Sequence, residues 1–268
     1  MNKLEERMVD VLKELKEKYG AVSVRAEFEA EGTKLEELLR LKEICMVAGV
    51  GLTLKIGGCE SIRDMLEARI VGVNYLVAPM VESAYALRKY LQAVNKVFPP
   101  EEKESIEILC NIETETAYKN LPEMLQIPEI DTLQGIVIER VDLCFSLGLD
   151  EQAINNKEIN EIILDVIAKT KKKNGKLICT VGGGVSAQSL PFFESIPKGY
   201  LDRYETRKVC FSWSDTIKDR DKAILKALGF EVLWLRNKLD YYSNITSADR
   251  KRMGLIEQRY WKAIDTLM

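Results

Sequence analysis

The stretch SIEILCNIETETAYKNLPEMLQIPEIDTLQGIVIER, residues 105–140, predicts a strand, a helix and a second strand in succession. Residues 105–113 and 135–140 are short, nearly continuous apolar runs, as expected of strands that are buried on both faces. Residues 114–127 between them carry apolar side chains at helical spacing, and the turn PEID follows. Strands separated by helices favour a parallel sheet, so this stretch predicts an α/β fold.

The same alternation of strands and helices continues in both directions along the chain. The expected strands are residues 21–29, 50–56, 74–80, 105–113, 135–140, 176–184, 207–213 and 230–236, after an amphipathic helix at residues 1–20. Eight repeats of roughly 30 residues use the whole chain. No G-x-G-x-x-G motif opens a helix after the first strand, which disfavours an open dinucleotide-binding sheet. We therefore predict one (β/α)8 TIM barrel domain over residues 1–268, with an additional N-terminal helix.

The composition is that of a soluble globular protein. Apolar residues make up 46% of the chain and charged residues 30%, which allows a large core. The formal net charge of −3 gives no basic footprint, so we expect no nucleic-acid partner. The N-terminus lacks the apolar stretch of a signal peptide, and no apolar run is long enough to predict a membrane span. The six cysteines are scattered without a CxxC pair, which favours reduced thiols in a cytoplasmic protein.

The chain contains no histidine. This absence excludes Ser-His-Asp and Cys-His nucleophilic sites, histidine general bases and histidine-ligated zinc. Any catalytic chemistry must therefore use carboxylates, lysine, arginine, tyrosine, cysteine or a metal ion held by oxygen ligands.

Reacting groups of (β/α)8 barrels lie at the C-terminal ends of the strands. This rule selects Glu27, Glu29, Lys55, Gly57, Gly58, Glu82, Glu113, Glu139, Arg140, Asp142, Gly182, Gly183, Gly184, Arg203 and Arg207. Glu113 and Asp142 follow two successive strands, and two carboxylates completed by water and substrate oxygens suit Mg²⁺ or Mn²⁺. Acidic residues also cap helices, and Glu113 with Thr114 stands where a helix begins. Spacing alone leaves both interpretations open.

Four stretches carry a further pattern: LTLKIGG (52–58), YLVAPMVES (75–83), ILCNIETETAYKNLPEMLQIPEIDTLQGIVI (108–138) and ERVDLCFSLG (139–148). Together they resemble the 4-hydroxy-2-oxoheptanedioate aldolase and citrate lyase β-subunit family of the phosphoenolpyruvate/pyruvate superfamily. The pairs that match this family in order and spacing are Glu113-Thr114, Asn120-Leu121, Asp142-Leu143 and Leu147-Gly148. The resemblance covers roughly residues 21–150 and is weaker beyond them.

The resemblance implies Glu113 and Asp142 as ligands of Mg²⁺ or Mn²⁺. It also implies a 2-oxo acid such as pyruvate as substrate, carbon–carbon lyase chemistry and a homo-oligomer. In such a site the metal polarises the 2-oxo group, and a cationic side chain neutralises charge as the carbon–carbon bond breaks or forms. Lys55 stands where the aldolases have an arginine in this role, and lysine lacks the bidentate fork of arginine.

The aldolases also carry a histidine base after the first matched strand, where this chain has AEFEAEG. Glu27, Glu29, Glu31 or a metal-bound water is expected to act instead. Strand alternation puts Glu27 and Glu29 on the same face, so we favour these two. The predicted catalytic residues are Glu27, Glu29, Lys55 and Arg140.

Glycines and arginines near the late strands indicate an anionic substrate. The loop 182–184 exposes backbone N–H groups that could cradle a phosphate or carboxylate, although a tight turn explains it equally well. Arg203 and Arg207 are expected either to clamp an anion or to lie exposed on a loop. The predicted substrate site comprises Gly57, Gly58, Glu82, Gly182, Gly183, Gly184, Arg203 and Arg207. Such a site suits a sugar acid or a phosphorylated sugar acid.

The sequence thus predicts a metal-dependent carbon–carbon lyase or aldolase that acts on a 2-oxo acid. Two alternatives stay open: an aldolase in which Lys55 forms a Schiff base without a metal, and a barrel that binds a 2-oxo acid or sugar phosphate without turning it over. The amphipathic first helix and the last one, residues 252–268, are expected either to close the barrel floor or to pack on another subunit.

Overall fold

Eight strands close into a barrel in the computed structural model, which describes residues 1–214 and 216–267. The strands are β1 (Ala21–Glu27), β2 (Gly51–Lys55), β3 (Tyr75–Ala78), β4 (Glu107–Ile112), β5 (Gly135–Glu139), β6 (Ile178–Gly182), β7 (Arg203–Glu205) and β8 (Val209–Ser212). They follow one another round the barrel in chain order, and β1 to β7 are parallel neighbours. The predicted TIM barrel with an additional N-terminal helix is confirmed. We call the end where β1 to β7 finish the mouth.

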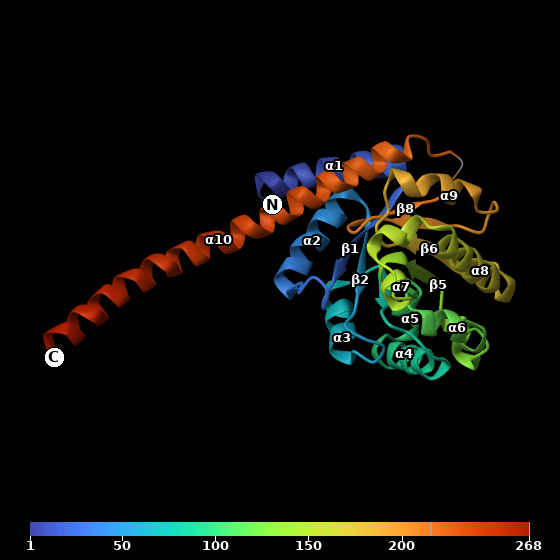
Figure 1. Ribbon diagram of the computed structural model, residues 1–268, viewed down its shortest axis with the longest axis horizontal. Helices are drawn as coiled ribbons and strands as arrows, with labels where there is room; N and C mark the ends of the chain where they lie inside the picture. Colours follow the sequence, from blue (N-terminus) through green and yellow to red (C-terminus); the bar gives the residue numbers. More distant parts are fainter. Residues whose placement is uncertain (215, 268) are drawn as a thin grey trace.

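Helices surround the barrel (Figure 1). They are α1 (Lys3–Tyr19), α2 (Leu35–Ala48), α3 (Ile62–Val71), α4 (Ala84–Val97), α5 (Pro100–Lys103), α6 (Glu115–Met124), α7 (Arg140–Ser146), α8 (Lys157–Lys173), α9 (Leu190–Ser195) and α10 (Arg220–Leu267), with short 3₁₀ turns η1 (Pro128–Thr132), η2 (Glu151–Asn155) and η3 (Ala187–Ser189). The N-terminal helix α1 begins with a capping box between Asn2 and Glu5 and ends at Gly20, whose φ of 70° suits glycine. Its buried face packs on α10 and α2. None of the helices in the described part of the chain is long and apolar enough to cross a membrane.

The last two strands differ from the sequence prediction. The expected strand 230–236 is wrong, because these residues lie within α10. Phe230, Leu233 and Trp234 are buried at helical spacing while Val232 and Leu235 are exposed, so a helix with two apolar faces gave the appearance of a strand. The eighth strand comes instead from a hairpin of β7 and β8.

The hairpin makes the barrel depart from eight parallel strands, since β8 runs antiparallel to both β7 and β1. Its turn, residues 206–208, therefore lies at the mouth together with the ends of the parallel strands. This reversal brings Glu205 and Lys208 to the same end as Lys55.

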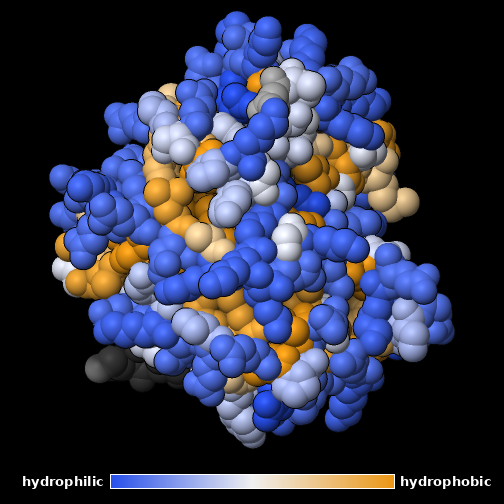
Figure 2. Space-filling model, turned by 90° about the vertical axis from the view of Figure 1, so that its right-hand side faces the viewer, coloured by the Kyte–Doolittle hydropathy of each residue, from blue (hydrophilic) through white to orange (hydrophobic). Residues whose placement is uncertain are grey.

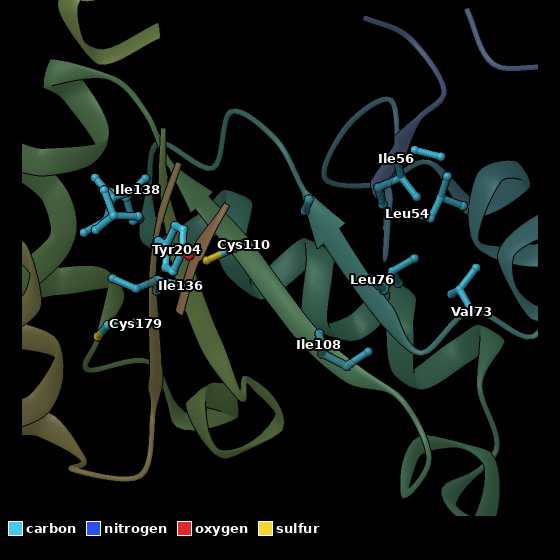
Figure 3. Close-up of a cluster of buried hydrophobic side chains, with 14 of the residues drawn as sticks. Leu54, Ile56, Val73, Leu76, Ile108, Cys110, Ile136, Ile138, Cys179 and Tyr204 are labelled. Atoms are coloured by element: carbon cyan, nitrogen blue, oxygen red, sulfur yellow. The ribbon is translucent and has the colours of Figure 1, made fainter. Parts of the chain in front are cut away.

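Two apolar regions pack against the strands, one outside the barrel and one inside it. The large core lies between strands and helices and includes Leu54, Leu76, Ile108 and Ile136, which Figure 3 shows among their neighbours. A small separate cluster of Val77, Leu109 and Val137, with Tyr75 against it, fills the barrel lumen. Charged groups above and below this lumen cluster therefore do not share a site.

Hydrophilic residues cover most of the face that Figure 2 shows, which is the side of the molecule away from the free end of α10. Hydrophobic residues appear there in patches between them. The six cysteines are free, and five of them are buried.

Candidate active site

Arg25 lies at the centre of the mouth and is almost completely buried. Its Nη1 donates to the carboxylates of Glu139 and Glu205, and its Nη2 lies 3.1 Å from Oε1 of Glu27. Burial alone would lower the pKa of Arg25, but the charges of Glu139, Glu205 and Glu27 raise it well above its ordinary value. The side chain is thus a fixed positive charge that joins β1, β5 and β7 across the lumen.

Lys55 reaches the mouth from the end of β2. Its Nζ lies 3.0 Å from Oε2 of Glu27, and its side chain is 13% exposed. Glu27 and Lys55 are register partners on neighbouring strands, so the ion pair is built into the barrel pairing. The ammonium group also acts electrostatically on Glu113 and Glu139. The charge of Lys55 therefore acts on the predicted metal ligand Glu113.

Glu113 follows β4 and is buried, with 1% of its surface exposed. Its Oε1 accepts from the Met80 backbone N–H at 2.7 Å, and its Oε2 accepts from Asn111 Nδ2 at 2.8 Å. Met80 has a φ of 52°, an uncommon value for a residue other than glycine, and it aims its N–H at this carboxylate. Burial raises the pKa of Glu113 to about 7 against the lowering effect of these hydrogen bonds and of Lys55.

Asp142 lies in the first turn of α7, directly after β5, and is partly exposed. No described group donates to its carboxylate or forms an ion pair with it. Because β4 and β5 are parallel neighbours, Glu113 and Asp142 come from adjacent strand ends, as predicted.

The residues around Glu113 fit a divalent cation. Glu113 is a buried carboxylate that forms no ion pair with a lysine or arginine among the described residues. The Oδ1 atom of Asn111 beside it is buried and has no hydrogen-bond partner among the described residues, so an acceptor is left for a ligand or water. Within the described chain no three residues of the types His, Cys, Asp and Glu gather as a metal site. A divalent ion here would therefore be held by two carboxylates together with water and substrate oxygens. Mg²⁺ accepts such a ligand set.

Arg140, predicted as catalytic, points away from the mouth and is fully buried. It donates to Gly182 O and Asn155 Oδ1 at 3.0 Å and to Ser189 Oγ at 3.1 Å, and it lies over the Phe193 ring. Burial lowers its pKa to about 10. Its N–H groups are bound by acceptors of the protein itself, so Arg140 stabilises the segments that carry Asn155 and Ser189.

The glycine run 182–184 makes room for neighbouring protein groups. A Cβ atom on Gly182 would lie 3.0 Å from Glu205 Cγ and 3.1 Å from Glu139 Oε1. Gly183 has a φ of 74°, and a Cβ there would lie 2.5 Å from the Arg140 backbone N. Close packing thus accounts for these glycines without a ligand.

The remaining predicted residues are dispersed around the rim. Glu82 accepts from Thr114 Oγ1 at 2.7 Å, which ties the loop after β3 to the start of α6. Glu29 is exposed and packs over Gly57, where a Cβ would lie 2.8 Å from Glu29 Cγ; Gly58 lies in the same loop. Arg207 is exposed in the β7–β8 turn, 3.5 Å from Glu31.

Arg203 is not at the mouth. It opens β7 at the opposite end of the barrel, where its Nη1 and Nη2 donate to Glu107 at 2.7 and 3.0 Å. The lumen cluster of Val77, Leu109 and Val137 lies between this pair and the mouth. The structure therefore does not bring Arg203 together with Arg207, because the strand begins at Arg203 and ends before Arg207.

Sequence reasoning missed Arg25 and Glu205. Arg25 has the same strand parity as Glu27, so the alternation that selected Glu27 also places Arg25 in the lumen. Glu205 had no such signal, because β7 has only three residues and its hairpin was not predicted.

The sequence model of the HpcH/HpaI aldolase/citrate lyase family matches residues 55–189, half of the chain. The chain belongs to the HpcH/HpaI aldolase/citrate lyase family. The matched segment contains Lys55, Glu113 and Asp142, and it ends before β7. The predicted family and the predicted class of carbon–carbon lyase enzymes are confirmed, and members of this family generally depend on a divalent metal.

Solved structures of the family show the same fold. An HpcH/HpaI aldolase from Desulfitobacterium hafniense is 15% identical, with a TM-score of 0.60 over 74% of this chain and 81% of its own. An HpcH/HpaI aldolase/citrate lyase family protein from Burkholderia cenocepacia is 12% identical, with a TM-score of 0.60 over 92% and 100%. The citrate synthase SbnG is 14% identical, with a TM-score of 0.59 over 87% and 90%. No curated protein matches the chain in sequence.

Proposed function

We propose that the protein is a carbon–carbon lyase or aldolase that uses Mg²⁺ or Mn²⁺ and acts on a 2-oxo acid such as pyruvate. The observation that carries the proposal is the position of Glu113 and Asp142 at the ends of adjacent strands, with the Lys55 ammonium acting on Glu113. This arrangement supplies two carboxylates for a divalent ion and one positive charge for an anionic substrate beside it.

The chain's own groups have distinct tasks in this proposal. Glu113 and Asp142 would hold the metal, which when bound supplies Lewis-acid polarisation of the 2-oxo group. Lys55 neutralises negative charge that develops on the substrate, and Glu27 keeps its ammonium in place. Met80 and Asn111 hold Glu113 in a single orientation.

Support for a phosphorylated sugar acid is weaker than support for a small 2-oxo acid. Glycines 182 and 183 are required by Glu139, Glu205 and Arg140, and Arg203 lies at the opposite end of the barrel. Arg207 is the remaining predicted cation at the rim. We therefore favour a small acid such as pyruvate or a short sugar acid, and the free, mostly buried thiols suit the reducing cytoplasm.

The experiment is turnover of oxaloacetate to pyruvate, and of pyruvate with short aldehydes, in the presence of Mg²⁺ or Mn²⁺. Turnover should disappear with chelator and return when the metal is restored. Glu113→Gln and Asp142→Asn should each abolish it. Full activity of both variants in the presence of chelator would refute the proposal.

A Schiff-base mechanism is the second candidate, because Lys55 is a mostly buried lysine at the mouth. The Lys55 Nζ lies 3.0 Å from Glu27 Oε2, so it is engaged in an ion pair rather than free to attack a carbonyl. Borohydride added with pyruvate would trap a covalent adduct on Lys55 if this candidate holds, and chelator would then have no effect. A barrel that only binds would show metal-dependent binding of pyruvate in calorimetry and no product.

We also propose that the protein forms a homo-oligomer through α10. Five aliphatic residues are exposed on this helix at alternating spacings of three and four: Leu225, Leu228, Val232, Leu235 and Leu239. They lie opposite the buried face that includes Phe230, so the helix is apolar on both sides. Such a heptad stripe packs best against another helix with the same stripe, which a second copy of this chain supplies.

A further inference from the structure

Five charged side chains meet at the mouth in one buried network. Arg25 contacts Glu27, Glu139 and Glu205, and Lys55 contacts Glu27. The network thus contains three carboxylates and two cations. Fully ionised, it would bury one uncompensated negative charge, which is costly in a site closed to water. One proton on one of the carboxylates makes the network neutral.

The groups that face this network from other elements do not supply the missing positive charge. Lys208, from the β7–β8 hairpin, pairs with Glu31, and Glu31 also lies near Arg207. Cys210 on β8 is a buried thiol whose pKa is raised by burial, so it is neutral. Glu113, which follows β4, adds a further acidic group rather than a cation.

Glu139 and Glu205 are the two carboxylates that share the proton, because Arg25 Nη1 donates to an oxygen of each and so brings the two carboxylates together. Two buried carboxylates held this close are most stable when one of them carries a proton. Burial raises the pKa of Glu205 to about 7, with Arg25 opposing and Glu139 adding to the rise. Burial also acts on Glu139, but Arg25 and Lys55 hold its pKa below the ordinary value. The proton therefore sits on Glu205.

The fold makes room for this pair. Gly182 lies between the two acids, and a Cβ there would come within 3.1 Å of an oxygen of each. Any other residue at this position would push the carboxyl groups apart. The barrel mouth therefore has space for the two carboxyl groups because residue 182 is a glycine.

We propose that the Glu139–Glu205 pair stores the proton that this enzyme gives to the substrate carbon, in place of the histidine that the chain lacks. The proposal rests on the proposed function, since it assumes an enolate of a 2-oxo acid. Glu139 ends β5, three residues before Asp142, so it lies at the same strand end as the predicted metal ligand, and the charge of Lys55 acts on it. Glu205 acts through Glu139 and is a positioning and proton-supplying residue.

The glutamates favoured from the sequence are less suited to this task. Glu27 is bound by Arg25 through one oxygen and by Lys55 through the other, so neither oxygen is free to face a substrate. Glu29 is exposed to solvent. Glu31 is paired with Lys208 and Arg207.

When a carbon–carbon bond of the substrate breaks, its electron pair stays on the 2-oxo acid as an enolate. The proton of Glu205 passes to Glu139, and the Glu139 carboxyl then gives it to the enolate carbon, where the new C–H bond forms. The substrate loses one negative charge and the pair gains one. Water then returns a proton to the pair.

The test is the pH profile of oxaloacetate decarboxylation at saturating Mg²⁺, where metal binding keeps Glu113 ionised. Activity of the unmodified enzyme should fall as the pH rises above about 7, where Glu205 loses its proton. Glu205→Gln keeps a donor for Glu139 but cannot release a proton, so the rate should drop by about 100-fold and the decline above this pH should vanish. The matched control is Glu107→Gln, which breaks the Arg203 pair at the opposite end and should keep the profile.

Each outcome decides the question. Glu205→Gln with the original rate, or with a lower rate and an unchanged pH decline, would overturn the proton-store role. If the unmodified enzyme does not act on oxaloacetate, the proposed function fails for that substrate, and infrared spectroscopy decides on the proton separately. In a Glu113→Gln background, a band of a protonated carboxylic acid should disappear as the pH rises through about 7. Its persistence after the additional change Glu205→Gln would overturn the assignment of the proton to Glu205.

Discussion

Lys55 and Glu27 form an ion pair between neighbouring strands, with 3.0 Å between Lys55 Nζ and Glu27 Oε2. The two residues are direct partners in the β1–β2 register, and Arg25 holds the other oxygen of the same carboxylate. Glu27 is therefore a shared anchor for both cations of the mouth. The position of the Lys55 ammonium follows from strand pairing rather than from a flexible loop.

The charge of Lys55 is expected to be essential for turnover. Lys55→Met removes the cation beside the substrate and should lower kcat/KM for oxaloacetate by about 100-fold or more. Lys55→Arg keeps the charge but changes its shape, so it should retain more activity than Lys55→Met. Steady-state kinetics at saturating Mg²⁺ check both variants. Equal loss in both would mean that the amine itself is required, as in a Schiff base.

Asp142 is expected to bind metal rather than only stabilise its helix. Asp142→Asn should abolish Mn²⁺ binding in calorimetry while costing no more than about 1 kcal/mol of stability through the helix dipole. Glu115 is the matched control, because it also lies partly exposed in the first turn of a helix, α6, but pairs with Lys119. Glu115→Gln should keep Mn²⁺ binding. Unchanged binding in Asp142→Asn would restore the helix-capping interpretation.

Glu205 should make the protein less stable as the pH rises. Its pKa in the folded state is raised from 4.5 to about 7, so between these values the folded state holds a proton that the unfolded state has lost. The free energy of unfolding must fall with pH across this interval. Glu205→Gln removes this contribution, so its stability relative to the unmodified protein should improve from about pH 5 to about pH 8. Urea unfolding at both pH values measures the difference, and a constant difference would contradict the raised pKa.

The sequence predicted the mouth residues that lie directly at the ends of regular strands. Lys55 and Glu113 were found because strand alternation and the barrel rule fix where such residues point. Residues 230–236 were misassigned because a short apolar run is compatible with a strand and with a helix that is apolar on two faces. That error hid the β7–β8 hairpin and with it Glu205.

The ion-pair network around Arg25 also could not be predicted from local sequence patterns. Arg25 and Glu205 are 180 positions apart and meet only because the barrel closes. The glycine run was correctly placed at a strand end, but its reason, the space needed by Glu139 and Glu205, depends on those same distant contacts. Arg203 was assigned to the mouth because residues 203–207 were expected to form a loop beside the strand 207–213, whereas Arg203 in fact begins the strand β7.

Gly183 should tolerate no side chain. Its φ of 74° is strained for alanine, and a Cβ would lie 2.5 Å from the backbone N of Arg140, which cannot move without displacing α7 and Asp142. Gly183→Ala should destabilise the protein by roughly 1–3 kcal/mol and weaken Mn²⁺ binding. Gly199→Ala is the control, since it has a φ of 80° but no neighbouring atom near its Cβ position. Equal effects of the two variants on Mn²⁺ binding would show that only backbone strain matters.

The outer face of α10 should determine the oligomeric state. Leu228 and Leu235 lie in the middle of the exposed stripe, and the helix continues well beyond the barrel (Figure 1), where Ile245 and Met253 are also exposed. A helix of 48 residues extends roughly 70 Å, and between residues 245 and 258 its large apolar side chains are exposed, where a second copy would cover them. Leu228→Glu with Leu235→Glu places like charges at the centre of such a pairing.

The double variant should shift the protein from oligomer to monomer in size-exclusion chromatography with light scattering. Its circular dichroism should stay close to that of the unmodified protein, because both side chains face solvent in one subunit. Ile70→Glu on α3 is the matched control, an aliphatic residue that is 75% exposed and lies outside the stripe. Dissociation by Ile70→Glu but not by the double variant would place the interface on α3. A monomeric unmodified protein at micromolar concentration would refute the pairing altogether.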